Sequence, residues 1–176
     1  VENNNLIFIG PSSKIVRNMG EKDKAKLIME KAGIPVVPGY HGKIQDKNFL
    51  EQTAKKVGYP ILIKARAGGG GRGMRVAETS TKFLSALEEA TSEAKTNFKD
   101  KNCLLEKYIS KARHIEIQIF GDKYGNVIHL FDRDCSLQRR QQKIIEEAPC
   151  PELNNDIRTF LGDLSVKAAR SIKYEG

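Results

Sequence analysis

The chain has 176 residues and a formal net charge of +8 at pH 7, from 30 Lys and Arg against 22 Asp and Glu. With 39% hydrophobic and 30% charged residues, the composition is that of a folded domain and excludes intrinsic disorder. No apolar run reaches the roughly 18 residues of a membrane helix, and the first ten residues lack the features of a secretory signal. Three scattered cysteines (Cys103, Cys135, Cys150) are too few for a disulfide framework or a zinc site, which favours free thiols in a reducing compartment.

The positive charge points to an anionic partner, either nucleic acid or nucleotide phosphate, or else to a lysine-rich surface. The excess of basic residues lies in the first third of the chain, mostly as Lys in helical patterns. Nucleic-acid modules usually interleave basic residues with aromatic ones for base stacking, whereas this chain has 7% aromatic residues and no Trp. Nucleic acid is therefore the less favoured partner.

The N-terminal part of the chain begins with an apolar segment, LIFIG at 6–10, that is typical of a buried strand with neighbours on both sides. Helical periodicity then predicts a helix over 21–32, ended by Gly33 and Pro35. The following IPVVPGYHG, at 34–42, is typical of an extended linker and predicts a subdomain boundary.

The middle of the chain alternates helices and short strands. A second helix is predicted over 47–57, and strands over 61–65, 74–78 and 103–109. Between the last two strands, apolar residues recur at helical spacing and predict one further helix: Phe83, Leu84, Leu87, Ala90 and Ala94.

The C-terminal part reads as an antiparallel hairpin followed by a polar strand and a helix. Residues 113–120 alternate, with three isoleucines on one face and His114, Glu116 and Gln118 on the other. With 127–131 they form the hairpin, whereas 132–149 is polar yet strand-like and 155–172 is helical. The fold class is therefore α+β, with antiparallel strands and helices that cover one face.

The strongest local feature is a glycine-rich loop, AGGGGRGM at 67–74, between two predicted strands. Residues without a β-carbon let backbone N–H groups converge on an anion. The loop is neither G-x-G-x-x-G opening a helix nor G-x-x-x-x-G-K-[ST], so a flap over phosphates is the favoured interpretation. A merely flexible hairpin is the alternative, although four successive glycines cost backbone entropy that such a hairpin does not need.

Three residues near this loop allow two interpretations each. Lys64 ends an apolar strand and is well placed for phosphate, or is an edge lysine that reaches solvent. Lys22 opposes the dipole of its predicted helix, yet the same helix start favours a bound anion. Glu106 can accept a hydrogen bond from a purine amine, but taken alone a solvated glutamate at the end of a strand is favoured.

The polar segment 132–147 has no net charge. Its internal neutrality indicates a polar network that lines a cleft rather than a solvated tail. The face carrying His114 is either solvated or part of that site. His41, His114 and His129 assemble neither a Ser/His/Asp set nor a metal cluster, so no metal ligand is predicted.

Six segments, in this order and spacing, resemble the biotin carboxylase family of ATP-grasp ligases over the whole chain: MGEK, AGIPVVPGYHG, GYPILIKARAGGGGRGMRV, LLEKYI, RHIEIQIFGDKYGN and DRDCSLQRRQQKIIEEAP. GYHG and IIEEAP resemble the biotin-containing α subunit of methylcrotonoyl-CoA or propionyl-CoA carboxylases. The resemblance implies an ATP-grasp fold with a complete lid at 37–108. Residues 1–36 would be the tail of the N-terminal domain and 109–176 the start of the C-terminal half, both truncated.

The resemblance also implies a reaction. ATP would phosphorylate bicarbonate to carboxyphosphate, whose carboxyl group passes to biotin on a carrier domain and then to an acyl-CoA through a carboxyltransferase subunit. The Mg²⁺ ligands are expected downstream of this chain, so the isolated chain is expected to be inactive. No nucleic-acid or membrane partner is expected, and the compartment would be the bacterial cytoplasm or the mitochondrial matrix. The alternatives are another ATP-grasp carboxylate-amine or carbamoyl-phosphate ligase, and a basic nucleic-acid-binding module.

The family's nucleotide-binding residues match positions throughout the chain. Lys22 and Lys64 resemble the phosphate-binding lysines. The loop that closes over the triphosphate would contain Gly68, Gly69, Gly70, Gly71 and Gly73. The residues that resemble the adenine pocket are Met74, which would pack on the base, and Glu106 with the backbone of Lys107, Tyr108 and Ile109. His114 resembles a nucleotide-contacting residue.

The implied catalytic residues lie in the polar segment. Lys143 resembles the bicarbonate-binding lysine, and Gln138 is expected in the same strand. Gln141 stands where bacterial members often have His. An amide can hydrogen-bond a ribose or phosphate but cannot titrate near pH 7. The resemblance does not indicate which acyl-CoA is served or the oligomeric state.

Overall fold

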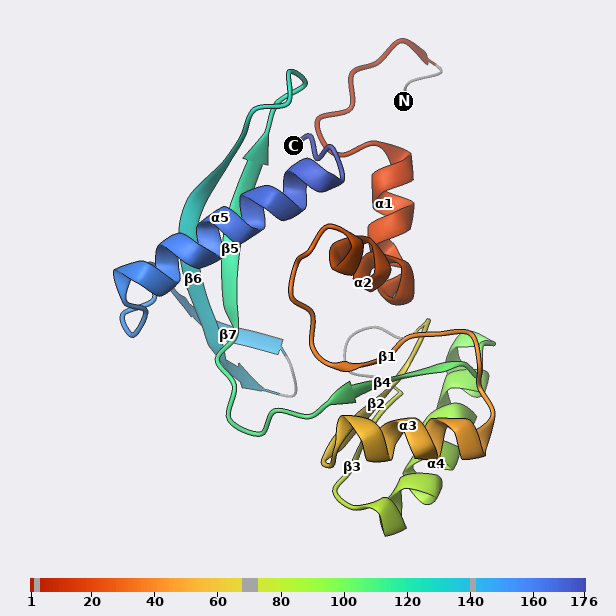
Figure 1. The fold of residues 1–176 in the computed structure, drawn as a ribbon. Coiled ribbons are helices and arrows are strands. Elements are labelled where there is room, and N and C mark those ends of the chain that lie inside the picture. Colours follow the sequence, from red (N-terminus) through yellow and green to blue (C-terminus); the bar gives the residue numbers. More distant parts are fainter. Residues whose placement is uncertain (2–3, 68–72, 140–141) are drawn as a thin grey trace.

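The structure is a computed structural model that describes residues 1, 4–67, 73–139 and 142–176. Its strands form two antiparallel sheets, a four-stranded sheet in the order β1-β4-β2-β3 and a three-stranded sheet in the order β5-β6-β7. Figure 1 shows the two sheets as separate units, each with its own helices, and α1 and α2 beside them. The predicted α+β class is therefore confirmed.

The four-stranded sheet carries the main hydrophobic core. Its elements are β1 (Gly39–Tyr40), β2 (Ile61–Ala65), β3 (Met74–Ala77), β4 (Cys103–Lys107), α3 (Lys47–Val57) and α4 (Ser80–Phe98). Side chains alternate along β2, so that Ile61 and Ile63 are fully buried against α3 and α4, among Leu50, Phe83 and Leu87. The other face of this sheet carries Lys64 and Glu106 together with Leu62 and the buried Leu104.

β1 lies within the segment that the sequence predicts as a linker. It pairs with β4 through Gly39 and Glu106, and a β-carbon at Gly39 would clash with the carbonyl oxygen of Leu105. The backbone approach therefore requires glycine at this position, and the linker contributes a strand to the sheet.

The three-stranded sheet is crossed by a single long helix, α5 (Figure 1). Its elements are β5 (Ile115–Gly121), β6 (Val127–Arg139), β7 (Gln142–Glu147) and α5 (Asn155–Ser171). The predicted hairpin of β5 and β6 forms, but β6 runs further than predicted because the polar segment continues it. Gly162 brings α5 close to β6, since a β-carbon there would lie 2.5 Å from His129 Nε2.

The N-terminal segment differs from the prediction. Residues 6–10 form no strand, and the side chains of Ile7 and Ile9 are 92% and 93% exposed. A strand of this kind needs neighbours, and no strand in the described part of the chain pairs with it. Two helices follow, α1 (Ser13–Gly20) and α2 (Lys22–Lys31), of which only α2 was predicted. The Ser12 hydroxyl caps α1 by accepting the backbone N–H of Ile15 at 3.4 Å.

The cysteines agree with the sequence prediction, since Cys103, Cys135 and Cys150 are all free and buried. Burial raises the pKa of the Cys103 thiol to about 11, which keeps it protonated at neutral pH. Among the helices of the described residues, none is both long and apolar enough to cross a membrane.

Candidate functional site

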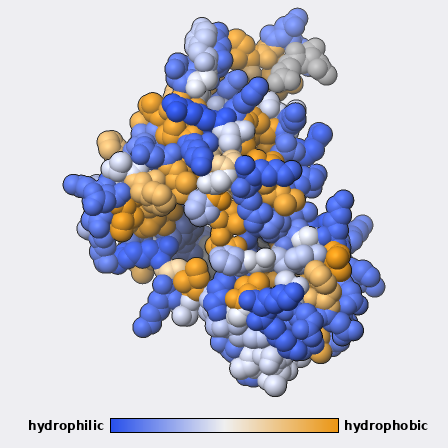
Figure 2. Space-filling view, viewed as in Figure 1, coloured by the Kyte–Doolittle hydropathy of each residue, from blue (hydrophilic) through white to orange (hydrophobic). Residues whose placement is uncertain are grey.

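Two lysines pair with one glutamate at the face of the four-stranded sheet opposite α3 and α4, and a third lysine lies within their electrostatic reach. We call Lys22, Lys26, Lys64 and Glu106 the lysine cluster. Lys22 and Lys26 are one turn apart on α2, Lys64 lies on β2 and Glu106 on β4. β2 pairs with β4 with Lys64 opposite Leu104, so Lys64 and Glu106 lie on the same face. Figure 2 shows the surface hollowed between the two units of the molecule.

Each oxygen of the Glu106 carboxylate has its own lysine partner. Lys26 Nζ lies 2.5 Å from Oε1, and Lys64 Nζ forms an ion pair with Oε2. Lys26 also donates to the carbonyl oxygen of Val37 at 3.4 Å. The Glu106 side chain is 9% exposed, so the interpretation as a solvated glutamate at the end of a strand is wrong.

The charges in the lysine cluster do not balance. Burial opposes ionisation of Glu106, but the hydrogen bonds and charges of Lys26 and Lys64 outweigh it and hold the pKa of the carboxyl below its ordinary value. Burial and then repulsion from Lys64 lower the pKa of Lys22, against the attraction of Glu106. Three ammonium groups around one carboxylate leave excess positive charge, which attracts a polyanion.

The C-terminal end of the glycine loop is anchored to the same sheet. Gly73 is buried and donates its N–H to Glu93 Oε1 at 2.9 Å, and its carbonyl oxygen accepts the N–H of Ala65 at 2.8 Å. Met74 is half-buried at the start of β3, paired with Lys64. The other predicted loop residues, Gly68, Gly69, Gly70 and Gly71, lie outside the described residues.

The predicted adenine-reading segment begins at Glu106 within β4 and leaves the strand after Lys107. The N–H groups of Lys107 and Tyr108 donate to the carbonyl oxygens of Pro38 and Pro60 at 2.8 and 3.0 Å. The Lys107 ammonium donates to Gly58 and Tyr59 carbonyl oxygens, at 2.9 and 2.6 Å. The side chain of Lys107 therefore holds the loop after α3. Within the described residues, the N–H of Ile109 has no such acceptor, and its side chain is 54% exposed.

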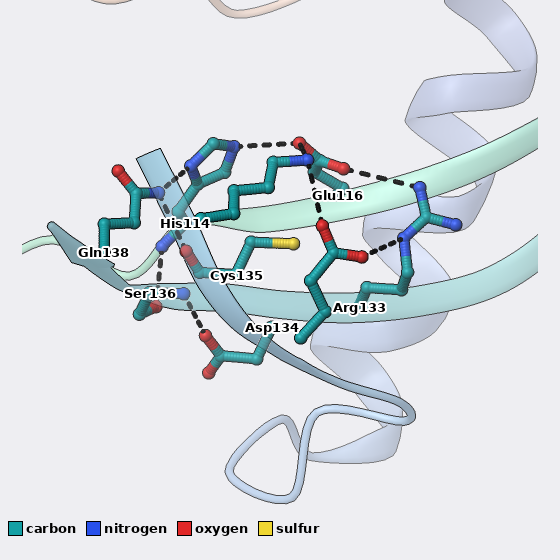
Figure 3. A network of polar contacts seen from close by, with 9 residues as sticks. His114, Glu116, Arg133, Asp134, Cys135, Ser136 and Gln138 are labelled. Carbon is teal, nitrogen blue, oxygen red and sulfur yellow. Dashed lines mark hydrogen bonds and ion pairs between the residues drawn. The ribbon is translucent and has the colours of Figure 1, made fainter. Parts of the chain in front are cut away.

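A second group of polar residues lies on the three-stranded sheet (Figure 3). We call it the Glu116 network; its members are His114, Glu116, Arg133, Gln138, Lys143 and Glu146. Glu116 is the centre, because its carboxylate lies 2.5 Å from Lys143 Nζ, 3.2 Å from His114 Nε2 and 3.3 Å from Arg133 Nη2. Gln138 Nε2 lies 2.6 Å from His114 Nδ1.

Gln138 and Lys143 lie on different strands. Gln138 is on β6 and Lys143 on β7, and the two are register partners across the ladder. The prediction that they share a strand is wrong, because β6 ends at Arg139 and β7 begins at Gln142. The pairing nevertheless keeps the two residues adjacent. Gln141 lies outside the described residues.

Glu116 fixes the charge state of its network. The hydrogen bond from Lys143, followed by that from Arg133, lowers the pKa of Glu116 although burial opposes the shift. The same hydrogen bond raises the pKa of Lys143, so its ammonium stays charged at neutral pH. The sequence did not single out Glu116 as a site residue. The only signal was its place between His114 and Gln118 on the polar face of β5.

Two aspartates of the polar segment are structural. Asp132 is 1% exposed and accepts the N–H of Cys150 and the Nε–H of Arg158, both at 2.7 Å. Asp134 accepts the N–H of Ser136 at 2.8 Å and the Nη1 of Arg113 at 2.6 Å. The bonds of Asp132 tie β6 to Cys150 before α5 and to α5 itself, and those of Asp134 tie it to Arg113 before β5. Both carboxylates are therefore engaged in holding the fold together.

Comparison with known proteins places the chain in a family. Residues 21–176 match the family described as the carbamoyl-phosphate synthase L chain, ATP binding domain. The chain is 52% identical over 171 residues to the mitochondrial methylcrotonoyl-CoA carboxylase subunit alpha of Mus musculus, covering 97% of this chain and 24% of that protein. It is 46% identical over 172 residues to biotin carboxylase 1 of Bacillus subtilis (strain 168), covering 98% of this chain and 38% of that protein.

Solved structures of biotin carboxylases also resemble this chain. The biotin carboxylase of Campylobacter jejuni, in a complex described as beta-gamma-ATP, superposes with a TM-score of 0.93 at 48% identity. The biotin carboxylase domain of Hydrogenobacter thermophilus 2-oxoglutarate carboxylase, with MgADP, ADP and bicarbonate, superposes with a TM-score of 0.92 at 47% identity. Each match covers 99% of this chain and 39% of the solved chain.

The chain thus spans between about a quarter and two fifths of the length of these four relatives. The ATP-grasp fold implied by the sequence motifs is confirmed by these structures. The chain belongs to the family of the carbamoyl-phosphate synthase L chain ATP-binding domain, and its likeness within that family is to the biotin carboxylases.

Proposed function

We propose that this chain forms part of a biotin carboxylase, a ligase that uses ATP to activate bicarbonate and carboxylates biotin. The observation that carries the proposal is the lysine cluster, in which the ammonium groups of Lys26 and Lys64 meet at the buried Glu106, with Lys22 close enough to be repelled by Lys64. The relatives support it, since their solved structures are complexes with beta-gamma-ATP and with MgADP, ADP and bicarbonate.

In this proposal, Lys22 and Lys64 bind the phosphates of ATP. Their ammonium groups come from α2 and β2, and Lys64 lies on the strand that enters the glycine loop. Fixed positive charges of this kind neutralise the charge that develops on phosphoryl oxygens without rearranging during the reaction. The loop at 68–73 would cover the phosphates with backbone N–H groups.

The base of ATP would lie along the segment after β4. Glu106 supplies an acceptor for the exocyclic amine, and the N–H of Ile109 supplies a donor for a ring nitrogen. Met74, at the start of β3, packs on the base. The backbone of Lys107 and Tyr108 holds this segment in place through its bonds to Pro38 and Pro60.

The Glu116 network would hold bicarbonate. Lys143 is kept charged by Glu116 and attracts the anion, and Gln138 lies opposite Lys143 on β6. Gln138 and Glu116 contact the two ring nitrogens of His114 and so fix the orientation of its ring, which would contact the nucleotide. These residues act by positioning two anions for reaction with each other.

Other components of the reaction are assigned to the protein that contains this chain. In the described residues, no group of three or more His, Cys, Asp or Glu could hold a metal ion, so none is assigned to Mg²⁺. Mg²⁺ bound with ATP supplies neutralisation of phosphate charge. We propose biotin on a carrier domain and an acyl-CoA carboxyltransferase subunit as partners, in the bacterial cytoplasm or the mitochondrial matrix. Residues 37–108 would be the lid, between the N-terminal domain (1–36) and the C-terminal half (109–176).

Calorimetric titration of the 176-residue chain with ATP tests the nucleotide site. Lys22→Met and Lys64→Met are each expected to weaken ATP binding about tenfold or more, because each substitution removes one charge-assisted hydrogen bond to phosphate. Lys24→Met is the matched control, because Lys24 is an exposed lysine of the same helix that pairs with Glu21. Absence of ATP binding, or an equal loss in the control, would contradict the proposal.

The family description favours carbamoyl-phosphate synthesis as a second candidate. An assay of ATP hydrolysis by the full-length protein distinguishes biotin carboxylation from carbamoyl-phosphate synthesis. Bicarbonate-dependent ATP hydrolysis that free biotin stimulates supports biotin carboxylation. Stimulation by ammonia without any effect of biotin supports the second candidate.

A further inference from the structure

We propose that Lys26 is a positioning residue, the permanent counter-ion of Glu106, whose presence leaves Lys64 able to move to phosphate. Lys26 itself touches no phosphate in this scheme. The inference rests on the proposed function in one respect, since it takes phosphate to be the ligand of Lys64.

Lys26 and Lys64 contact Glu106 independently of each other. Lys26 holds Oε1 of Glu106 from α2, whereas Lys64 holds Oε2 from β2, so either can leave without moving the other. Lys26 has a second bond, to the Val37 carbonyl oxygen, and its side chain is 18% exposed. Lys64 is 25% exposed and lies on the strand that leads into the glycine loop. Lys64 is therefore the partner that an incoming anion can draw away.

The burial of Glu106 makes the second counter-ion necessary. A buried carboxylate that loses its only partner is strongly destabilised, because its charge is left without either water or a cation. With Lys26 in place, the departure of Lys64 leaves Glu106 paired through Oε1. Without Lys26, phosphate would have to strip Glu106 of its remaining ion pair, and phosphate affinity would fall.

The same step prepares the site for a purine. When Lys64 moves to phosphate, Oε2 of Glu106 loses its donor and becomes an acceptor for the exocyclic amine. Phosphate binding and base recognition are thereby coupled through one carboxylate. Lys26 keeps that carboxylate ionised, and hence an acceptor, in the bound state.

The test is calorimetric titration of the 176-residue chain with inorganic triphosphate, which lacks a base. Lys26→Met is expected to weaken triphosphate binding about tenfold, the scale of one charge-assisted interaction. Lys24→Met removes the same charge from the same helix and should change affinity less than about twofold, as expected for an exposed pair. Lys26→Arg should restore most of the affinity. Lys26→Gln, which keeps a donor for Glu106, is the second variant if Lys26→Met does not fold.

A double-mutant cycle with Glu106→Gln separates the counter-ion role from general electrostatics. Glu106→Gln releases Lys64 and should strengthen triphosphate binding. In that background, Lys26→Met should cost no more than Lys24→Met. The proposal is overturned if Lys26→Met and Lys24→Met are equivalent in the wild-type background, or if the full loss persists with Glu106→Gln. Failure of the wild-type chain to bind either triphosphate or ATP would instead overturn the proposed function, and this inference with it.

Discussion

Lys143 on β7 reaches across β6 to Glu116 on β5, with 2.5 Å between the ammonium nitrogen and the carboxylate oxygen. One ion pair therefore spans the whole width of the three-stranded sheet. It joins the residue expected to bind bicarbonate to the residue that orients His114.

The first prediction concerns this pair. Lys143→Met is expected to raise the pKa of Glu116 toward the ordinary value of 4.5, because the hydrogen bond from Lys143 is the largest cause of its depression. Carbon-13 NMR titration of the Glu116 carboxyl measures the shift. Lys123→Met is the control, since Lys123 lies over the ring of Tyr124 in the β5–β6 turn. An unchanged Glu116 pKa in Lys143→Met would contradict the pairing.

The second prediction concerns acid stability. The folded pKa of Glu106 lies below 4.5, so its contribution to folding is present above pH 4.5 and is lost as pH falls through the folded value. Glu106→Gln should therefore make the free energy of unfolding less dependent on pH below 4.5. Urea denaturation at a series of pH values measures this. Equal slopes for the wild type and the variant would refute it.

The third prediction concerns the buried aspartate of β6. Asp132→Ala removes the acceptor of both Cys150 and Arg158 and leaves a partly buried guanidinium without its carboxylate. We expect the free energy of unfolding to fall by about 3 kcal/mol or more. Glu88→Gln disrupts the exposed pair with Lys47 and should leave the free energy of unfolding nearly unchanged. Chemical denaturation of both variants compares the two costs directly.

The fourth prediction concerns the approach of β1 to β4. Gly39→Ala places a methyl group against the carbonyl oxygen of Leu105 and the Cα of Glu106, so we expect a loss of about 1 to 3 kcal/mol in stability. Gly20→Ala is the control, because a β-carbon there meets nothing within 4 Å. Thermal denaturation should separate the variants; similar midpoints would mean that β1 is not held against β4.

Local signals in the sequence were sufficient for most elements. The helix α3 and the strand β2 have the predicted bounds, since each is specified by periodicity and by a glycine or proline at its end. The hairpin of β5 and β6 forms as predicted because its alternation and turn are adjacent in the chain, although β6 extends to Arg139, beyond its predicted end. The glycine loop and the lysines beside it could be singled out for the same reason, and the family motifs then assigned them to phosphate.

Contacts between distant segments were not accessible to this reasoning. β1 is a strand only because Gly39 meets Glu106, far along the chain, and residues 6–10 are not a strand because no strand among the described residues pairs with them. Glu106 looked like a solvated residue at the end of a strand until Lys26 and Lys64, from two other elements, were found on its two oxygens. The sequence by itself determined the local elements and the abundance of lysine. Only the tertiary structure decided which lysines share a carboxylate, because burial and ion pairing depend on groups that folding brings together.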